Sequence, residues 1–260
     1  MGNAPDSRYH RPVAHPSQSA PPDYTVRESR RAHAVRIRIS TCGDVEVVVP
    51  VGFDSSRIPS LVAQHAESIG DARARIRRSR LAAGTADDTS EPPARLVLAA
   101  LEEDWHVTWT HDPSKPATVR LAGTARLHGA ADTTSLDSWA EALRAWLIGR
   151  AKHRLIPQTE ERAEQLDVPV PAVRIGCQRT RWGSCSARGT VSLNAQLLFL
   201  PSRLVEYVIV HELCHTVHLN HSPAFWRLVA LHVPDLAPVR DELHSAWSYV
   251  PAWLAARPSA

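Results

Sequence analysis

One short segment constrains this chain more than any other: residues 211–215 read His-Glu-Leu-Cys-His, an H-E-x-x-H pattern. Residues four apart on an α-helix share one face and lie one turn apart, so His211 and His215 can reach the same zinc ion with bonds of about 2.0–2.1 Å. The overlapping run 204–213 (LVEYVIVHEL) is apolar almost all round, as a buried helix should be. The sequence therefore predicts a buried helix that carries two metal ligands.

A catalytic zinc ion needs a third protein ligand, and the two candidates are His218 and His221. On a straight helix, His218 would lie about 10 Å along the axis from His211, which is far for a shared ion. Asn220 is a good helix terminator, and Ser222-Pro223 is typical of an N-cap followed by the first residue of a new helix. The chain is therefore expected to turn there, which favours His221 as the ligand and places His218 at the rim of the site or behind a ligand.

Glu212 follows the first of these histidines directly, so its carboxylate can face a water molecule held by the metal. Zinc lowers the pKa of such a water toward neutrality. The glutamate can accept a proton as this water attacks a carbonyl carbon, and can then pass the proton to the leaving amine. The pattern thus predicts one zinc ion, Glu212 as the catalytic residue, and cleavage of peptide bonds in a peptide or protein substrate.

Two blocks of sequence extend this motif. The first is residues 181–186 (RWGSCS), followed by residues 191–194 (VSLN); the second is residues 207–215 (YVIVHELCH), followed by residues 220–226 (NHSPAFW). Together they resemble the YgjP-like metal-dependent hydrolases, which are related to the SprT-like and WLM groups of minimal gluzincin-type metallopeptidases. The resemblance is strong over about 173–233 and looser over 35–172. It implies His221 as the third ligand, and a twisted sheet packed on the active-site helix with the substrate along an edge strand.

Other residues in these blocks have less certain roles. Trp182 can pack in the core or line the cleft, and core packing is the preferred interpretation. Ser184 and Asn194 can hydrogen-bond substrate or orient a ligand. Cys185 and Cys214 are thiol ligands in principle, but Cys214 lies off the face that His211 and His215 share, so packing is favoured for both cysteines.

The hydrophobic pattern predicts an α+β fold with a β-rich N-terminal half and a zincin-like C-terminal half, in which a small sheet packs on the H-E-x-x-H helix. Alternating apolar residues predict strands, and apolar residues at helical spacing predict helices. A helix from about residue 139 to 165 should be interrupted or kinked by Pro157. The expected parts are a disordered tail (1–31), a β-rich region (32–132), a zincin-like metallopeptidase region (133–250) and a C-terminal tail (251–260).

The elements expected within these parts follow from the same patterns. The strands are a hairpin over 35–51, segments 95–110 and 117–128, and two short strands at 173–177 and 189–193. The other helices are 57–80, 204–219, 223–232 and 238–249.

Composition limits the cellular compartments and the binding partners that we expect for the protein. The chain has 260 residues, of which 43% are hydrophobic and 22% charged, so it can bury a core and is not disordered as a whole. The four cysteines form no C-x-x-C pair, which argues against a disulfide scaffold and favours a reducing compartment. No signal-type segment and no apolar run near 20 residues is present. We therefore expect a soluble, cytoplasmic protein with no membrane partner; its oligomeric state stays open.

Two alternatives remain beside the peptidase. A formal net charge of +3 does not by itself argue for nucleic acid, but residues 73–80 are rich in arginine, so a DNA-associated, SprT-like protease is a minor alternative. The arginines that would contact phosphate are Arg73, Arg75, Arg77, Arg78 and Arg80. The second alternative is a zinc-stabilised binding module without catalysis, which would close the fourth metal position with Cys214 or His218.

Overall fold

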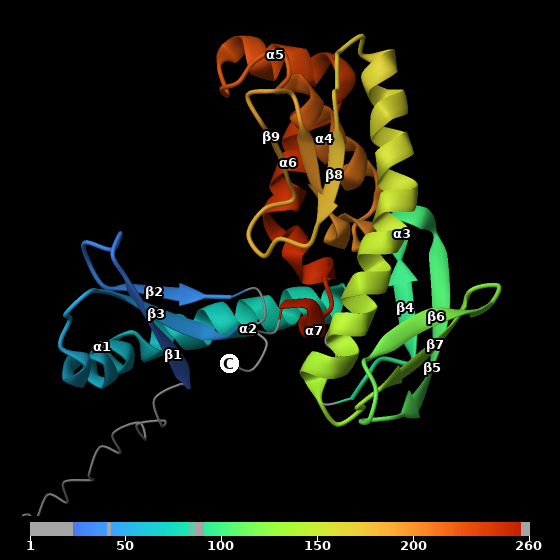
Figure 1. Cartoon of the computed structure of the whole chain (residues 1–260). Helices are drawn as coiled ribbons and strands as arrows, with labels where there is room; N and C mark the ends of the chain where they lie inside the picture. The colour runs from blue at the N-terminus through green and yellow to red at the C-terminus, as the bar shows by residue number, and fades with distance from the viewer. Residues whose placement is uncertain (1–22, 41–42, 84, 86–90, 256–260) are drawn as a thin grey trace, which may run out of the picture. The chain divides into compact units, whose positions relative to one another are not determined.

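A computed structural model describes residues 23–40, 43–83, 85 and 91–255, and these residues form a mixed α/β fold (Figure 1). Their strands belong to three sheets. The described chain divides into two compact units, of which the first comprises 23–38 and 44–71 and the second comprises the rest. The boundary between the two units falls within the arginine-rich helix α2 (Ala66–Ala82), and the division expected at residue 132 stays a prediction.

The first unit is built around a three-stranded sheet of order β1-β3-β2, in which β1 and β3 are parallel. Apolar residues of β3 and α1 are buried together in a small core. They are Val45, Val47, Val48 and Val49 of β3 and Ile58 and Val62 of α1. Its elements are β1 (Tyr24–Ser29), β2 (Arg36–Ile39), β3 (Val45–Pro50), η1 (Ser55–Arg57), α1 (Ile58–Gln64) and the start of α2 (Ala66–Ala82).

This unit confirms the predicted hairpin strands and corrects the predicted tail. Residues 1–22 lie outside the described part of the chain, but residues 24–29 form β1 instead of continuing a tail to residue 31. Five of the six β1 residues are polar or exposed, with Val26 48% exposed, so a strand held mainly by backbone hydrogen bonds left no hydrophobic pattern to find. The single helix predicted over 57–80 is divided at His65 into α1 and α2.

The second unit begins with a four-stranded sheet of order β4-β5-β7-β6. Strands β5 and β7 are parallel, whereas β4 and β6 pair antiparallel at the two edges. The strand expected over 95–110 is two strands, because Glu102 adopts a left-handed backbone conformation (φ 54°) after a short 3-10 turn. The elements are β4 (Arg95–Leu98), η2 (Ala99–Leu101), β5 (Glu103–His111), β6 (Thr118–Gly123) and β7 (Arg126–Ala131).

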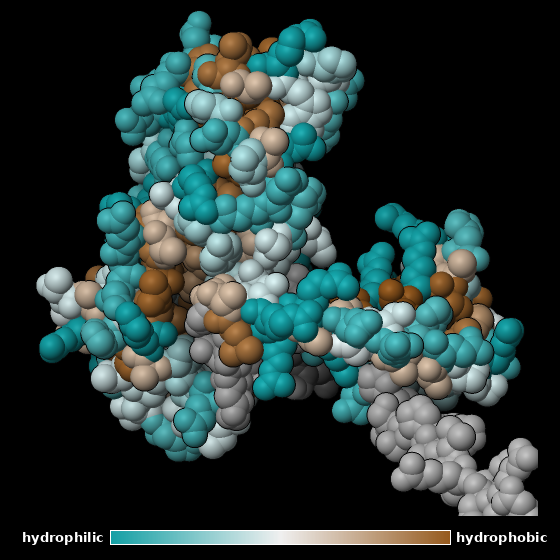
Figure 2. All heavy atoms as spheres, turned by 180° about the vertical axis from the view of Figure 1, so that it is seen from behind, coloured by the Kyte–Doolittle hydropathy of each residue, from teal (hydrophilic) through white to brown (hydrophobic). Residues whose placement is uncertain are grey.

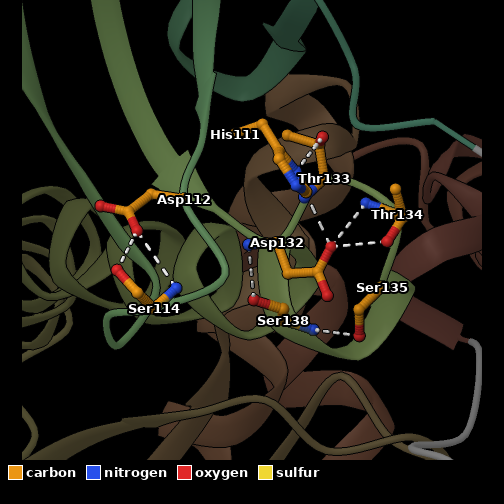
Figure 3. Close-up of polar contacts among 8 residues, drawn as sticks. All are labelled: His111, Asp112, Ser114, Asp132, Thr133, Thr134, Ser135 and Ser138. Carbon is orange, nitrogen blue, oxygen red and sulfur yellow. Dashed lines mark hydrogen bonds and ion pairs between the residues drawn. The ribbon is translucent and has the colours of Figure 1, made fainter.

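A polar turn leads from β7 into the long helix α3 (Leu136–Gln165), as Figure 3 shows. The Asp132 carboxylate accepts hydrogen bonds from the Thr134 backbone N–H (3.0 Å) and hydroxyl (2.6 Å). Ser135 is the N-cap, and its hydroxyl accepts a hydrogen bond from the Ser138 N–H at 3.4 Å. These bonds satisfy donors that a helix start leaves unpaired, so α3 begins three residues before the position expected from the hydrophobic stripe.

Helix α3 continues through Pro157, so of the two expected effects, an interruption or a kink, the interruption does not occur. Proline removes one backbone hydrogen bond, but Leu155 before it and Ala163 after it are both buried in the same core. That packing outweighs the loss of one bond in a helix of 30 residues. In the second unit α3 contacts both sheets, through β6 and β7 of the larger and β8 of the smaller (Figure 1).

The smaller sheet has the order β8-β10-β9, with β10 parallel to β8 and antiparallel to the edge strand β9. Its strands are β8 (Val173–Gly176), β9 (Gly183–Cys185) and β10 (Val191–Asn194), and η3 (Ala195–Phe199) follows. Strands β8 and β10 confirm the two short strands that the sequence predicted. The hydrophobic pattern alone did not predict strand β9, because it has only three residues and begins with a glycine, but the strand lies in the Trp-Gly-Ser-Cys block on which the family resemblance rests.

Five helical segments complete the second unit, and the first of them is nearly all buried. They are α4 (Ser202–Cys214), α5 (Pro223–His232), α6 (Leu236–Ser245), η4 (Ala246–Tyr249) and α7 (Ala252–Ala255). Helix α4 contacts β9, β10, α3, α5 and α6 (Figure 1), which explains the apolar character of its sequence on every side. The tail expected from residue 251 instead includes α7, where Trp253 and Leu254 are each 3% exposed.

Hydrophilic residues predominate on the face drawn in Figure 2, and hydrophobic residues reach the surface there only in places. Among the described helices, none combines the length and the apolar character that a membrane-spanning segment requires.

Candidate metal centre

Three histidine side chains converge at the end of α4. The Nε2 atom of His221 lies 3.1 Å from Nε2 of His211 and 3.2 Å from Nε2 of His215. Among the described residues, these three form a group whose candidate ligand atoms all lie within 4.8 Å of one another. The structure thus brings together the three histidines that the sequence proposed as ligands.

The spacing of these nitrogen atoms fits a tetrahedral metal ion. Two ligand atoms at about 2.0–2.1 Å from zinc, separated by a tetrahedral angle, are about 3.3–3.4 Å apart. The measured 3.1 and 3.2 Å are close to this value. A cation between the rings would turn the mutual repulsion of three converging lone pairs into attraction, so the donor set suits a metal with a preference for imidazole.

The backbone beyond α4 decides which nitrogen atom of His215 faces the centre. The Nδ1 atom of His215 lies 2.9 Å from the carbonyl oxygen of His218. A carbonyl oxygen only accepts hydrogen bonds, so Nδ1 carries the hydrogen and Nε2 keeps its lone pair for the centre. His218 therefore acts through its backbone, and its imidazole is not part of the three-histidine group.

Helix α4 ends at Cys214, five residues earlier than the sequence analysis expected. The hydroxyl of Thr216 donates to the carbonyl oxygen of Leu213 at 2.7 Å, and the Thr216 N–H donates to the same oxygen at 2.9 Å. These bonds close the helix end with a tight turn. The early turn leaves enough chain between His215 and Ser222 to return His221 to the centre.

Helix α5 then begins as the sequence predicted, with Ser222 as N-cap and Pro223 in the first turn. Its aromatic residues surround the histidines: the Phe225 ring stacks on His215 (centroids 4.4 Å apart), and the Trp226 ring stacks on His221 (5.4 Å). Phe225 is fully buried. These rings hold the imidazoles in place, while His221 remains exposed to solvent.

Burial disfavours the protonated form of two histidines at the centre, His211 and His221. It lowers the pKa of His211 to about 3, with smaller contributions from His215, His221 and the positive charge of Arg240. Burial and the same neighbouring groups also lower the pKa of His221. Neutral imidazole is the form that binds a metal ion, so the environment keeps the rings ready for one. The Nδ1 atom of His211 is buried and has no hydrogen-bond partner among the described residues.

Glu212 lies beside the centre and against the small sheet. Its side chain is 6% exposed, and burial raises its pKa to about 7, although the charge of Arg181 lowers it. A Cβ atom added to Gly183 of β9 would lie 2.7 Å from both Cγ and Oε1 of Glu212. Only glycine fits against this carboxyl group in the observed geometry.

The segment before β9 is held by buried amides and a tryptophan stack. The Nδ2 atom of Asn194 donates to the carbonyl oxygens of Gln178 (2.6 Å) and Arg181 (2.9 Å), and its Oδ1 accepts from the Gln196 N–H (3.1 Å). Trp182 is 8% exposed and stacks on Trp247, with centroids 3.9 Å apart. Asn194 and Trp182 thus fix the loop that delivers Gly183 to Glu212.

The remaining sequence candidates lie outside the three-histidine group. Ser184 is in β9 opposite Ser192 of β10. Cys214 is fully buried and Cys185 partly buried, and burial raises the pKa of both thiols. A raised pKa disfavours the thiolate form that binds metal, so packing accounts for both cysteines.

Two residues near the centre were missed by the sequence analysis. Tyr207 lies one turn before His211, and the two rings meet edge to face with centroids 5.8 Å apart. Arg240 of α6 holds its guanidinium carbon 4.2 Å from the centroid of the Trp226 ring. The spacing of Tyr207 to His211 was visible in the sequence, whereas nothing in the sequence placed Arg240 near this site.

Two arginines of the arginine-rich segment on α2 form hydrogen bonds with the backbone. Arg73 donates from Nε to the carbonyl oxygen of Gly43 at 2.7 Å. Arg80 is 6% exposed and donates to the carbonyl oxygen of Thr85 at 2.8 Å. The exposed arginines of the segment are Arg75, Arg77 and Arg78.

Comparisons with known proteins identify the family of this chain. A family model described as YgjP-like, metallopeptidase domain, matches residues 33–246. Among solved structures, the crystal structure of the metallopeptidase zymogen of Pyrococcus abyssi abylysin is 27% identical over 34% of this chain and 89% of that one, with a TM-score of 0.31. No curated protein matches the chain. Because the family model spans most of the chain, including the three histidines and Glu212, this protein belongs to the YgjP-like metallopeptidase family.

Proposed function

We propose that this protein is a zinc-dependent peptidase in which His211, His215 and His221 hold one zinc ion. The observation that carries the proposal is the convergence of three Nε2 atoms at separations of 3.1 and 3.2 Å. Zinc, when bound, supplies a Lewis acid that polarises a carbonyl oxygen and lowers the pKa of water toward neutrality. The small sheet against α4 supports a zincin-like arrangement for this half of the chain.

Glu212 is the catalytic residue in this proposal. Its buried carboxyl group has a pKa of about 7 without metal, and such a group exchanges a proton readily near neutral pH. A carboxylate oxygen of Glu212 accepts the proton of the attacking water and then delivers it to the nitrogen atom of the leaving amine. Gly183 keeps this carboxyl group in one place, because its missing side chain leaves room for it.

The donor set favours catalysis over a purely structural zinc site. A structural site closes the fourth position with cysteine or histidine. The thiol of Cys214 and the imidazole of His218 are not in the convergent group, and a buried glutamate beside the ligands has no function in a structural site. These observations support a peptidase with an open metal position. A cytoplasmic location remains a prediction from the sequence, and a nucleic-acid partner remains its minor alternative.

The test compares wild-type protein with Glu212→Gln for zinc content and for hydrolysis of denatured casein. We expect about one zinc ion per chain in both proteins, and a loss of hydrolysis of about 10²–10⁴-fold in the variant, as for removal of a general base. Glu206→Gln makes the same chemical change on α4, at a side chain that is 39% exposed and paired with Arg162, and should leave both readouts unchanged. Equal hydrolysis by wild type and Glu212→Gln would refute the proposal.

A further inference from the structure

Arg240 is a cation without an acidic partner beside the metal centre. Its side chain is exposed, and the residues three and four positions away on α6 are Leu236, Ala237, Leu243 and His244, so no carboxylate of its own helix faces it. The nearest acidic residue that forms ion pairs on this helix, Glu242, is bound to Arg203. The Arg240 guanidinium instead lies over the Trp226 ring.

This contact places the cation close to the histidines. The Arg240 guanidinium carbon is 4.2 Å from the centroid of the Trp226 ring. That ring in turn has its centroid 5.4 Å from the His221 ring and 5.8 Å from the His211 ring. The positive charge of Arg240 accordingly lowers the pKa of both histidines.

The charges around the centre do not balance. Arg240 lies on one side, and Arg181 lies close enough to Glu212 to lower the pKa of its carboxyl group. Glu212 is the one buried acidic residue in the described part of the chain. A cation close to a metal centre repels the metal ion and weakens its binding. An anion bound next to the centre would compensate it.

The geometry of the guanidinium suits a carboxylate. A guanidinium that lies over an aromatic ring uses its face, and its N–H donors at the edge stay free to form two parallel hydrogen bonds with a carboxylate. We propose that Arg240 binds a carboxylate of the peptide substrate, so that the centre selects peptides with an acidic group close to the bond that is cleaved. This inference rests on the proposed peptidase function, because it assigns a substrate class to the same site.

The experiment measures binding apart from cleavage. Zinc-loaded Glu212→Gln protein is immobilised and incubated with a peptide library from a digested proteome, and the retained peptides are identified by mass spectrometry. We expect acidic residues to be enriched about two- to fivefold over the library, the strength of one solvent-exposed ion pair. Adding Arg240→Gln should abolish the enrichment, whereas Arg240→Lys should keep part of it because the charge remains.

Arg227 provides the matched control. It is exposed on α5 next to Trp226 in sequence, and it does not contribute to the pKa of His211 or His221. Adding Arg227→Gln removes the same charge and should leave the enrichment unchanged. The carboxylate subsite is overturned if the protein retains peptides without enriching acidic residues, or if it retains no peptide. It is also overturned if the enrichment is the same with and without Arg240. Failure of wild-type protein to cleave the same library would instead overturn the peptidase proposal.

Discussion

Gly183 lies directly against the side chain of Glu212, so that a Cβ atom at residue 183 would be 2.7 Å from the Glu212 Oε1 atom. Real Cβ atoms do not approach another heavy atom this closely, so Gly183→Ala must displace the carboxyl group. We expect this variant to lose most of the peptidase activity, by about tenfold or more for a displacement near 1 Å. Its zinc content should stay near wild type, because the atoms nearest to the added Cβ belong to Glu212 and not to a histidine.

The matched control for this variant is Gly149→Ala. Gly149 is an exposed residue of α3, and no heavy atom lies within 4 Å of its added Cβ. Alanine at that position should preserve activity and stabilise the helix by up to about 1 kcal/mol. Full activity of Gly183→Ala, measured on denatured casein, would show that Glu212 tolerates a different position.

Zinc should stabilise the fold through His221. A ligand that binds only the folded state adds about 2.7 kcal/mol when its free concentration is a hundredfold above Kd. Chelation should therefore lower the Tm of wild-type protein, and added zinc should restore it. In His221→Ala one of the three convergent nitrogen atoms is gone, so the Tm should respond little to zinc.

His218→Ala is the corresponding control. The carbonyl oxygen of residue 218, which orients His215 at 2.9 Å, belongs to the backbone and remains in this variant. Differential scanning calorimetry with and without zinc should therefore show a wild-type shift for His218→Ala. A wild-type shift for His221→Ala as well would remove His221 from the ligand set.

Asn194→Ala should destabilise the second unit. The variant leaves the carbonyl oxygen of Arg181 without its 2.9 Å donor and the buried Gln196 N–H without its acceptor. An unsatisfied buried polar group costs about 1–3 kcal/mol, so urea denaturation should show a loss of at least this size. Gln165→Ala changes an exposed amide at the end of α3 and should fall within about 0.5 kcal/mol of wild type. A similar small effect for Asn194→Ala would contradict the proposed restraint of the loop.

The ion pair between Glu103 and Arg150 predicts a pH-dependent stability. Burial alone would raise the pKa of Glu103, but hydrogen bonds from Arg150 and Trp105 outweigh it and hold this pKa below its ordinary value. The side chains are only 19% and 23% exposed. A depressed folded-state pKa adds stability that is complete above the unfolded value near 4.3 and is lost as the pH falls through the folded-state pKa.

Glu103→Gln should therefore cost about 1–3 kcal/mol at pH 7, and the difference from wild type should shrink as the pH falls below about 4. The neighbouring pair of Arg95 and Asp104 is 63% and 47% exposed, so Asp104→Asn should change stability by less than about 1 kcal/mol. Urea denaturation at pH 7 and at a pH of about 3 measures both. A difference for Glu103→Gln that grows toward low pH would contradict the sign of this prediction.

The centre could be predicted from the sequence better than the sheets around it. Two features of the centre depend only on neighbouring residues: the helical spacing of His211 and His215, and the start of α5 at Ser222-Pro223. Such local features can be predicted without knowing the tertiary contacts. Strand β1 has no alternation of buried and exposed residues, and β9 has three residues. Such strands exist because a partner strand supplies their hydrogen bonds, which the sequence does not display.

Features that depend on tertiary contacts could not be predicted either, because the local sequence does not show which residue will be the partner. Pro157 is tolerated because the core on both sides of it holds α3. Arg240 reaches Trp226 only because α6 packs on α4. The contact between Gly183 and Glu212 joins residues that are far apart in the chain, and the motif around Gly183 gave no reason for its glycine until the carboxyl group was placed beside it.

The stack of Trp182 on Trp247 has a consequence for biosynthesis. Trp182 lies next to Gly183, but its stacking partner is made much later in translation. A nascent chain that has not reached residue 247 on the ribosome leaves the Trp182 ring uncovered and the loop before β9 without this restraint. The loop that brings Gly183 to Glu212 therefore gains this restraint only after residue 247 has been synthesised.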